Sequence, residues 1–530
     1  MGGRDPSGYH LDAPLDTRRR TALGQLPYLA PPHPGRRDAP AGHGAYPVPG
    51  TDAAGGRPAA PFHRKRTESP AGAVGMTART MALGAFLYPT GHHAAAWRHP
   101  QAQADAGINF EHYVGLAQTA ERAGFDLLFL ADSAAARGKD WVALSRFATH
   151  YVAQFEPLTL ISALAAVTRR IGLVATASTT YNDPYSLARK LASIDHISHG
   201  RVGWNLVTSG NEEEAFNFGA TAYPPHAERY RRAREFAQVL KGLWDSWDDD
   251  AFPRDKASGL FLDVDKMHVL GHQGEHFSVR GPLNIPRSPQ GWPVLVQAGS
   301  SEAGKELAAE TAEVVFTAQR TLADAQAFYA DVKGRMARYG RQPSALKIMP
   351  GIFPVVAATE AEAQAKFEAL QDLIHPSVAL AILEHRLGVP LAHLPQDGPL
   401  PEIAEVESTR SRRALLLEVA RREGLSIRQL ALRVAGARGH WQVVGSGEQV
   451  ADAMQELFEN GGADGFNVMS PYLPGGLDDF VEHVLPVLRE RGLLRGEYQG
   501  TTLREHLGLQ RPPSPHLRAT AGLSSHELTA

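Results

Sequence analysis

Several apolar runs of this 530-residue chain end in polar side chains that are suited to binding a ligand. Asp132 follows the run that ends at Leu130, and its carboxylate could accept hydrogen bonds from a heterocycle or from hydroxyl groups. Thr179 lies in a hydroxyl-rich stretch, and Asn205 lies inside an apolar run. A buried amide needs hydrogen-bond partners, so Asn205 forms either a structural link or a ligand contact. The corresponding alternative for Asp132 is a helix cap or a solvated loop residue.

A second candidate site is the turn Gln297-Ala-Gly-Ser300-Ser301, which joins an apolar run to a helical pattern. The N–H groups of a helix N-terminus and two hydroxyls form a good anion site. The alternative is an ordinary serine cap. The two consecutive serines favour a phosphate.

Histidines are the candidates for catalysis. His92 and His93 follow the first apolar run and, with His99, form either a metal cluster or a substrate-facing group. His272 and His276 are four residues apart, but Gly274 argues against a helix and the order of residues is not that of a zinc protease. We therefore expect no bound metal. The catalytic residues are otherwise unassigned.

Strand-like and helix-like segments alternate from Leu83 onward, and together they make eight strand–helix units. This count predicts an α/β fold, a (β/α)8 TIM barrel whose site residues lie at the carboxyl ends of the strands. A doubly wound sheet is the alternative, but the first turn, Tyr88–His93, lacks a glycine fingerprint. Gly445-Ser-Gly447 is only a fragment of the glycine fingerprint of a dinucleotide-binding turn. The expected strands are 83–87, 125–130, 171–177, 201–207, 294–298, 314–317, 348–357 and 465–469. The expected helices are 109–123, 157–167, 185–197, 227–244, 301–310, 322–339, 360–373 and 477–491.

The barrel is expected to span residues 79–512, with insertions at 246–290 and 374–438 that suit lids or subunit contacts. The second insertion contains helical patterns at 377–387 and 411–423. Residues 1–78 are expected to form a disordered tail, because the first 75 residues hold 12 proline and 12 glycine and few apolar side chains. A translation start at Met76 is the open alternative. Residues 513–530 are expected to form a flexible C-terminal tail.

Composition excludes several classes of protein. The chain has no cysteine, which removes disulfides, iron–sulfur clusters and thiolate zinc sites. A net charge of −3 argues against nucleic acid as a partner. No run approaches the ~20 apolar residues of a membrane helix, and no signal peptide is recognisable, so we expect no membrane contact and a cytoplasmic location.

Taken together, these segments resemble the flavin-dependent monooxygenases of the bacterial-luciferase superfamily, and in particular the nitrilotriacetate and dibenzothiophene-sulfone monooxygenase branch. The resemblance covers about residues 82–510. It is carried by FLADS at 129–133, by STTYNDPYSLARKLASIDHISHGRVGWNLVTS at 178–209, by His226-Ala-Glu-Arg-Tyr230, by GPLNIPRSPQGWPVLVQAGSS at 281–301 and by GADGFNVMSPYLPGGLDDFVEHVLPVLRERG at 462–492.

The resemblance implies a two-component enzyme that takes reduced FMN from a separate NAD(P)H:flavin reductase and uses O2 to oxygenate a small organic substrate. The oxygenating species would be a flavin C4a-(hydro)peroxide. It also implies a homodimer or a homotetramer. The residues placed at the cofactor by the resemblance are Asp132, Thr179, Asn205, His226 and Tyr230 around the ring and ribityl chain, with Ser300 and Ser301 at the phosphate.

Three other functions remain open. An F420-dependent oxidoreductase shares the barrel and the cofactor face. A non-catalytic flavin-binding protein is the second, although no pocket residue is missing. A metal-dependent hydrolase is the third, but it would need a His-x-His motif where Tyr88-Pro89 stands.

Overall fold

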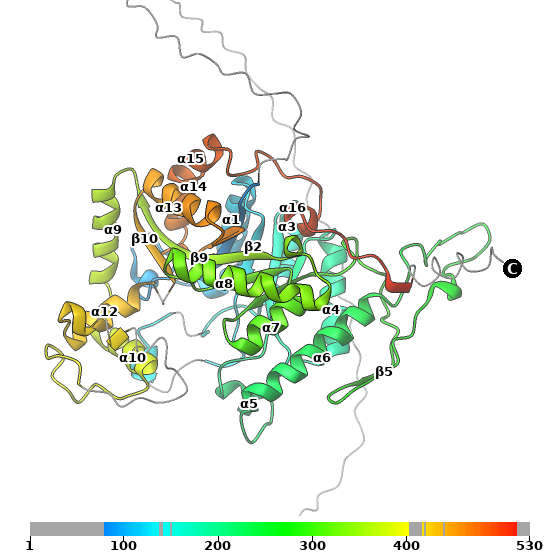
Figure 1. The fold of residues 1–530 in the computed structure, drawn as a ribbon, viewed down its shortest axis with the longest axis horizontal. Coiled ribbons are helices and arrows are strands. Elements are labelled where there is room, and N and C mark those ends of the chain that lie inside the picture. Colours follow the sequence, from blue (N-terminus) through cyan, green and yellow to red (C-terminus); the bar gives the residue numbers. More distant parts are fainter. Residues whose placement is uncertain are drawn as a thin grey trace, which may run out of the picture. The chain divides into compact units, whose positions relative to one another are not determined.

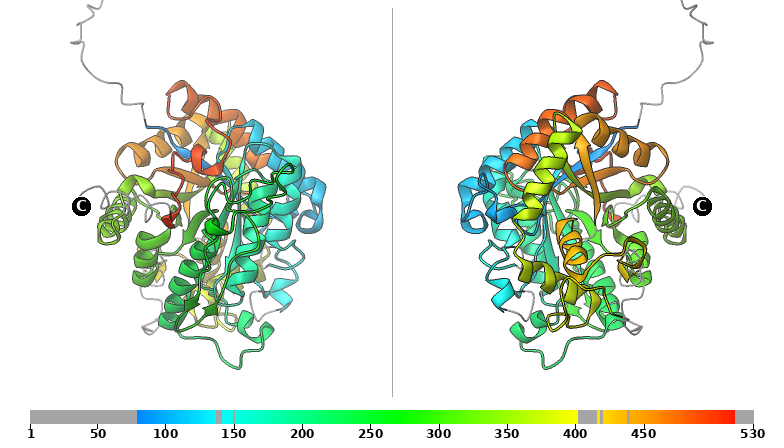
Figure 2. Two further views of the ribbon diagram at one scale, coloured as in Figure 1. Left: turned by 90° about the vertical axis from the view of Figure 1, so that its right-hand side faces the viewer. Right: turned by 90° about the vertical axis from the view of Figure 1, so that its left-hand side faces the viewer.

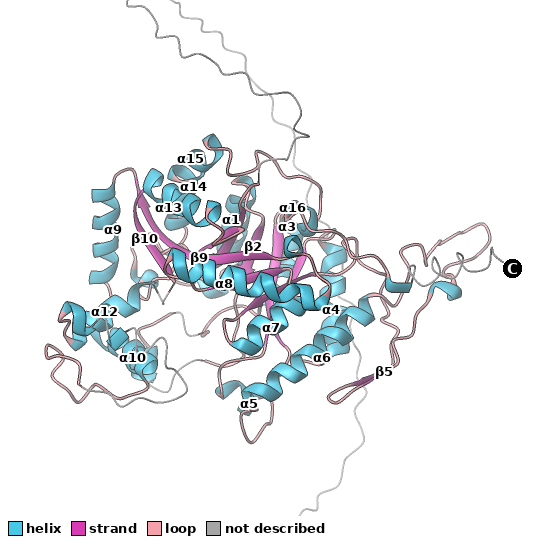
Figure 3. Cartoon of the chain, viewed as in Figure 1, coloured by secondary structure: helices cyan, strands magenta, loops and turns pink. Residues whose placement is uncertain are grey.

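A closed barrel of eight parallel strands forms the centre of the part of the chain that the structure describes (Figure 1). The computed structural model describes residues 79–136, 141–148, 151–401, 416–417, 420–437 and 440–516. The predicted tail 1–78 lies outside these residues, as do residues 517–530 of the predicted C-terminal tail. The strands lie inside and the helices outside, as Figure 3 shows by colour. The predicted TIM barrel is confirmed.

Each of the eight predicted strands is present, within a few residues of its expected ends. Most of their side chains are buried, as expected for strands that are covered by helices on the outside and packed against one another inside. The barrel order around the closed sheet is β1 (Ala82–Leu87), β2 (Leu127–Leu130), β3 (Gly172–Ser178), β4 (Val202–Val207), β7 (Val294–Ala298), β8 (Val314–Thr317), β9 (Lys347–Ala357) and β11 (Gly465–Val468).

A ninth parallel strand, β10 (Trp441–Ser446), was not predicted. It pairs with the second half of β9, beyond the point where β8 ends. Ile352 of β9 lies between Val468 of β11 on one side and Trp441 of β10 on the other. β10 therefore extends the barrel wall above β8. Its last residue, Ser446, caps the following helix, so Gly445-Ser-Gly447 is a helix start rather than a dinucleotide motif.

Helices surround the barrel on the sides seen in Figure 2. Asp183 caps α4 by accepting a hydrogen bond from the Ser186 N–H at 2.8 Å, and Pro184 occupies the first turn. The helices of the barrel are α1 (Phe110–Arg122), α3 (Pro157–Val167), α4 (Pro184–Ile197), α6 (His226–Trp244), α7 (Glu302–Thr311), α8 (Leu322–Arg335), α9 (Glu360–Asp372), α13 (Gly447–Glu459), α14 (Gly475–His483) and α15 (Leu485–Glu490). Shorter helices are α2 (Trp141–Leu144), α5 (Glu213–Asn217) and α16 (Leu503–His506).

The two predicted insertions differ in structure. Residues 246–290 form an arm, drawn in green at the right of Figure 1, that holds the two-stranded hairpin β5 (His272–Gln273) and β6 (Ser278–Val279). The second insertion holds α10 (Pro376–Leu387) and α12 (Ile427–Ala437), which pack against each other. The predicted helix 377–387 is confirmed. Most of the predicted helix 411–423 lies outside the described residues.

None of the described helices is both long enough and apolar enough to cross a membrane.

His93 joins the loop after β1 to α9. Its Nδ1 accepts a hydrogen bond from the Ala95 N–H at 3.1 Å, so Nε2 carries the proton and donates to Gln371 Oε1 at 2.9 Å. The ring is fully buried. Burial lowers the pKa of His93 to about 4, although the Gln371 hydrogen bond opposes the change. The neutral imidazole therefore stabilises the contact between this loop and α9.

This arrangement predicts a loss of stability in acid. Between pH 6.5 and about pH 4 the unfolded chain binds a proton at His93 and the folded protein does not, so stability falls as the pH falls through this range. His93→Gln removes this titration. We expect the urea midpoint of the His93→Gln variant to fall less between pH 7 and pH 4.5 than that of the wild type. Exposed His393 provides the control variant, His393→Gln, which should follow the wild type. Parallel curves for all three proteins would contradict this account.

Candidate active site at the barrel mouth

A cavity of about 270 Å³ opens among the carboxyl ends of the barrel strands. This is the end of a (β/α)8 barrel at which active sites are built. Strand ends supply most of the lining, and the insertion and the loops supply the rest. The lining residues are Phe86, Tyr88, Phe129, Ala131, Asp132, Tyr151, Thr176, Asn205, Val207, Ala298, Phe316, Arg386, His440 and Met469.

Three phenylalanines form an aromatic cluster on the cavity wall. The Phe86 ring meets those of Phe129 and Phe316 edge to face, with centroids 4.9 and 5.3 Å apart. The ring centroids of Phe129 and Phe316 are 5.4 Å apart. Such rings exclude water and offer flat apolar surface to a planar ligand.

Asn205 presents an amide to this cavity. Its Nδ2 donates a hydrogen bond to Thr176 Oγ1 at 2.8 Å, and the Thr176 hydroxyl in turn donates to the Leu130 carbonyl at 2.8 Å. The Asn205 Oδ1 atom is buried and has no hydrogen-bond partner among the described residues. A buried acceptor without a partner costs free energy, so a ligand N–H at this point would stabilise the site. Sequence analysis missed Thr176, although it is a polar residue in an otherwise apolar strand.

Asp132 lines the cavity two residues beyond β2, as predicted. Thr179 is fully buried but is not among the lining residues. Its hydroxyl donates to the Val207 carbonyl at 3.2 Å and thus links the ends of β3 and β4. The structure therefore brings Asp132 and Asn205 to the cavity and places Thr179 at the link between the ends of β3 and β4.

The turn after β7 adjoins the cavity through Ala298. Ser301 caps α7 by accepting a hydrogen bond from the Gly304 N–H at 3.1 Å, and its hydroxyl also lies 3.4 Å from the Tyr230 hydroxyl. Ser300 is exposed at the same turn. Tyr230, predicted to lie at the ring and ribityl chain, is therefore in contact with Ser301, predicted to lie at the phosphate, and Ser301 is the N-cap of α7.

His226 is the first residue of α6 and is exposed. Its ring packs against that of Tyr230 with centroids 4.7 Å apart. Lys305 is the first basic residue after the turn in the sequence. It forms ion pairs with Asp331 and with Glu302. An anion at this turn would therefore be held by N–H groups and hydroxyls.

The two histidines proposed for catalysis are buried beside the cavity rather than among its lining residues. His92 donates through Nε2 to the Phe86 carbonyl at 2.8 Å, and its ring packs against those of Phe86 and Tyr88. His93 points to α9 and Gln371. Their proposed role in catalysis stays a prediction.

Four further lining residues were not among the predicted site residues. The Tyr88 and Tyr151 hydroxyls are hydrogen bonded to each other. Tyr151 has a φ of 58°, a strained value for a residue other than glycine, of the kind that clusters at functional sites. His440 stacks on Phe316 with centroids 5.3 Å apart, and Arg386 belongs to α10. No local motif marks these residues, because loops and an insertion bring them to the barrel mouth.

A second cavity, of about 320 Å³, lies on the side of the barrel where the strands begin. Arg489 and Arg495 on its wall donate hydrogen bonds to the Ala123 and Gly124 carbonyls at the end of α1. Arg495 also forms an ion pair with Asp126, which precedes β2. These arginines stabilise a helix end and the barrel floor, so the smaller cavity at the mouth is the better candidate for chemistry.

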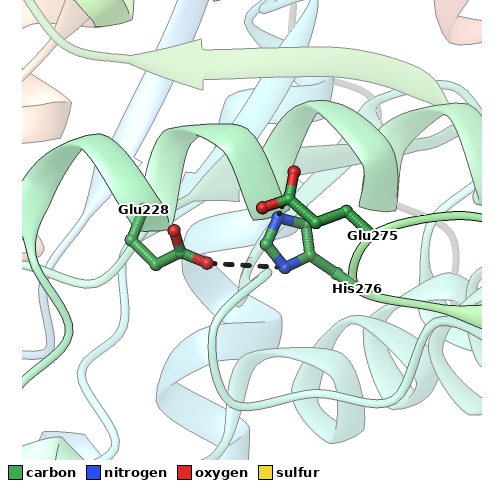
Figure 4. A group of neighbouring side chains, drawn as sticks. All are labelled: Glu228, Glu275 and His276. Carbon is green, nitrogen blue, oxygen red and sulfur yellow. Dashed lines mark ion pairs between the residues drawn. The ribbon is translucent and has the colours of Figure 1, made fainter.

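The histidines of 272–276 are not on a helix, as predicted, and their side chains contact different carboxylates. His272 lies 2.9 Å from Glu235. Glu228, Glu275 and His276 bring three possible metal ligands within 4.8 Å of one another (Figure 4). However, Glu228 and Glu275 lie near different nitrogens of His276, at 3.5 and 3.8 Å, and Arg231 pairs with both glutamates. We interpret this group as an ion-pair network that joins α6 to the arm.

Comparison with known proteins matches residues 87–465 to the luciferase-like monooxygenase family. The chain is 54% identical to the N-acetyl-S-(2-succino)cysteine monooxygenase of Bacillus subtilis, over 81% of this chain and 97% of that protein. It is 50% identical to nitrilotriacetate monooxygenase component A of Aminobacter aminovorans, over 82% and 97%. A crystal structure of riboflavin lyase with modified FMN and riboflavin superposes with a TM-score of 0.72 at 34% identity, over 82% and 97%.

The barrel, the cavity at its mouth and a family match over most of the chain agree with one another. The chain therefore belongs to the luciferase-like monooxygenase family, and it is an enzyme.

Proposed function

We propose that this enzyme is the oxygenase component of a two-component system, which uses reduced FMN and O2 to oxygenate a small organic substrate. The single observation that carries the proposal is the position of Asn205 Oδ1, a buried acceptor on the wall of an aromatic cavity that has no hydrogen-bond partner among the described residues. The name of one relative, a monooxygenase component A, supports a two-component arrangement. The FMN in the riboflavin lyase structure supports the choice of flavin.

The residues at the barrel mouth fit a flavin. Asn205 Oδ1 and the Asp132 carboxylate are acceptors for ring N–H groups and ribityl hydroxyls, and the phenylalanine cluster suits a planar ring. The Ser300–Ser301 turn and the N-terminus of α7 would hold the phosphate. When bound, reduced flavin supplies the electrons with which O2 is activated for oxygenation.

The protein's own contribution is orientation and the exclusion of water. Thr176 fixes the Asn205 amide, since it accepts from Nδ2 and leaves Oδ1 available to a ligand. The aromatic cluster excludes water from one wall of the cavity. Exclusion of water limits side reactions that would consume reduced flavin without oxygenating the substrate. α10 contributes Arg386 to the cavity wall, and Tyr151 also lines the cavity.

Replacement of Asn205 tests the cofactor site. Asn205→Leu keeps the branched shape and replaces the amide O and N by methyl groups, so we expect the affinity for reduced FMN to fall at least fivefold. The reason is that loss of one buried hydrogen bond costs roughly 1–3 kcal/mol, and 1.4 kcal/mol corresponds to one decade. Anaerobic titration of reduced FMN by fluorescence measures the change.

Asn467 is the matched control. Its Oδ1 is also buried with no hydrogen-bond partner in the described part of the chain, but Asn467 does not line the cavity. Asn467→Leu should alter the affinity for FMN less than threefold, which is within roughly 0.7 kcal/mol. Equal losses in the two variants would mean that Asn205 acts through the barrel core and not through the flavin.

The phosphate turn makes a separate prediction. Changing Ser300 and Ser301 together to alanine removes two donors to a charged group, at roughly 1.5–3 kcal/mol each before water compensates. FMN affinity should fall at least tenfold, while riboflavin, which lacks the phosphate, should lose far less. Calorimetric titration with both flavins measures the difference.

Because Ser301 also caps α7, the cap itself needs a control. Ser446→Ala removes an equivalent cap from α13, away from the cavity, and should leave both flavin affinities unchanged. Equal losses for FMN and riboflavin in the double variant would place the phosphate elsewhere.

Reductase dependence is the third test of this function. The chain has no complete dinucleotide fingerprint, and Gly445-Ser-Gly447 starts a helix, so the chain should not oxidise NADH itself. NADH consumption should begin only when a flavin reductase is added. Chemically reduced FMN should support oxygen consumption without any reductase. Direct oxidation of NADH by this chain and FMN alone would refute the two-component arrangement.

A further inference from the structure

Exposed apolar side chains are concentrated on the arm formed by residues 246–290. Twelve large hydrophobic residues are exposed in the described part of the chain, and five of them lie within residues 260–269. These five are Leu260, Phe261, Val264, Met267 and Val269, with Phe261 62% and Val264 66% exposed. Single exposed hydrophobic residues are ordinary, but several on one short segment indicate a surface that another molecule covers.

The end of the arm is held together by its own hydrogen bonds. The Asp255 N–H donates to the Leu260 carbonyl at 2.8 Å, and the Gly259 N–H donates to the Asp255 carbonyl at 3.0 Å. Among the described residues, every hydrogen bond of 254–261 is to another residue of the arm. In Figure 1 the arm extends away from the barrel. Its own barrel therefore does not cover Leu260 and Phe261.

The base of the arm is anchored to α6. Glu235 of that helix accepts hydrogen bonds from the N–H groups of His276 and Phe277, both at 2.9 Å. Trp247 Nε1 donates to the Leu283 carbonyl at 2.7 Å and so joins the two ends of the arm. A segment that is fixed in this way loses little conformational freedom on binding, so its apolar surface is preorganised for association.

The charges on the arm indicate which partner fits it. Residues 248–266 hold six aspartates but only three basic side chains, which argues against a nucleic acid or an anionic lipid surface. Exposed Lys256 and exposed Asp265 flank the apolar residues 260–264 in the sequence, and neither forms an ion pair with a described residue. An apolar surface flanked by both signs of charge is complementary to a second copy of itself.

We propose that the arm is a dimer interface, at which the arms of two copies of this chain pack against each other about a two-fold axis. In a two-fold interface each contact occurs twice, so Lys256 of each protomer pairs with the partner's Asp265. The apolar side chains of both arms bury one another between these two ion pairs. The inference is independent of the proposed function, because no residue of 246–290, all of which the structure describes, lines the cavity at the barrel mouth.

The test is sedimentation velocity of the full chain over a range of micromolar concentrations. We expect the wild type to be a dimer. The double variant Phe261→Glu/Val264→Glu should raise its dissociation constant about a hundredfold, because charges would replace apolar groups at the centre of the interface. Phe216→Glu is the matched control, since Phe216 is 55% exposed on α5, outside the arm, and it should sediment as the wild type.

Charge reversal tests the arrangement of the two arms. Lys256→Glu alone and Asp265→Lys alone should each weaken the dimer about tenfold, because the two-fold axis repeats every like-charge contact. The double variant Lys256→Glu/Asp265→Lys should recover the affinity of the wild type. A double variant that is as weak as the single variants would overturn the pairing of one arm with the other.

Cross-linking provides a test that does not depend on a disruptive substitution. The chain has no cysteine, so Ala257→Cys introduces a single exposed thiol on the arm. A short bismaleimide should join its two protomers, but not those of Glu497→Cys, whose exposed thiol lies at the second cavity. A monomeric wild type, an unaffected Phe261→Glu/Val264→Glu dimer or cross-linking at position 497 alone would overturn the proposal. A monomer would assign the arm to another occupant, such as a flavin reductase.

Discussion

Pairing of β9 with both β8 and β11 closes the sheet, and the candidate site depends on that closure. In a closed parallel barrel every strand ends at the same rim, so residues more than 300 positions apart in the chain become neighbours. Phe86 on β1, Phe129 on β2 and Phe316 on β8 form one aromatic cluster only because β1 and β8 lie on the same small ring of strands. Asn205 on β4 and Met469 after β11 line the same cavity for the same reason.

Closure alone leaves the mouth open, and the segments added to the barrel complete it. β10 continues the wall above β8 and places His440 on Phe316. The α10–α12 pair shares a hydrophobic cluster with the loop after β1, which also uses His93 to hold α9. These contacts fix Arg386 and cover the aromatic cluster, so the chemistry of the mouth depends on packing outside the barrel as much as on the strands.

One side chain at the site serves structure and binding together. Ser301 caps α7, and the same hydroxyl lies beside Tyr230 at the edge of the candidate phosphate site. A cap does not exclude an anion, because a helix N-terminus offers more N–H donors than one hydroxyl can satisfy. Ser301 can therefore cap the helix and also bind a phosphate. Only a comparison of the affinities for FMN and for riboflavin, which lacks the phosphate, distinguishes the two roles.

The sequence by itself determined the eight barrel strands, their helices and the strand-end residues Asp132, Asn205 and Ser301. The physical reason is that apolar runs, glycine ends and caps are local signals, and that strand ends of a parallel barrel meet at one rim whatever the details. The sequence did not show β10, because this strand is only half-buried and its capping serine resembled a nucleotide motif. Nor did it show Thr176, Tyr151, Arg386 and His440 at the cavity, or that Thr179 and His93 point elsewhere. Which side of a wall a side chain faces, and which distant helix lies above it, is decided by long-range packing, and only the tertiary structure contains that information.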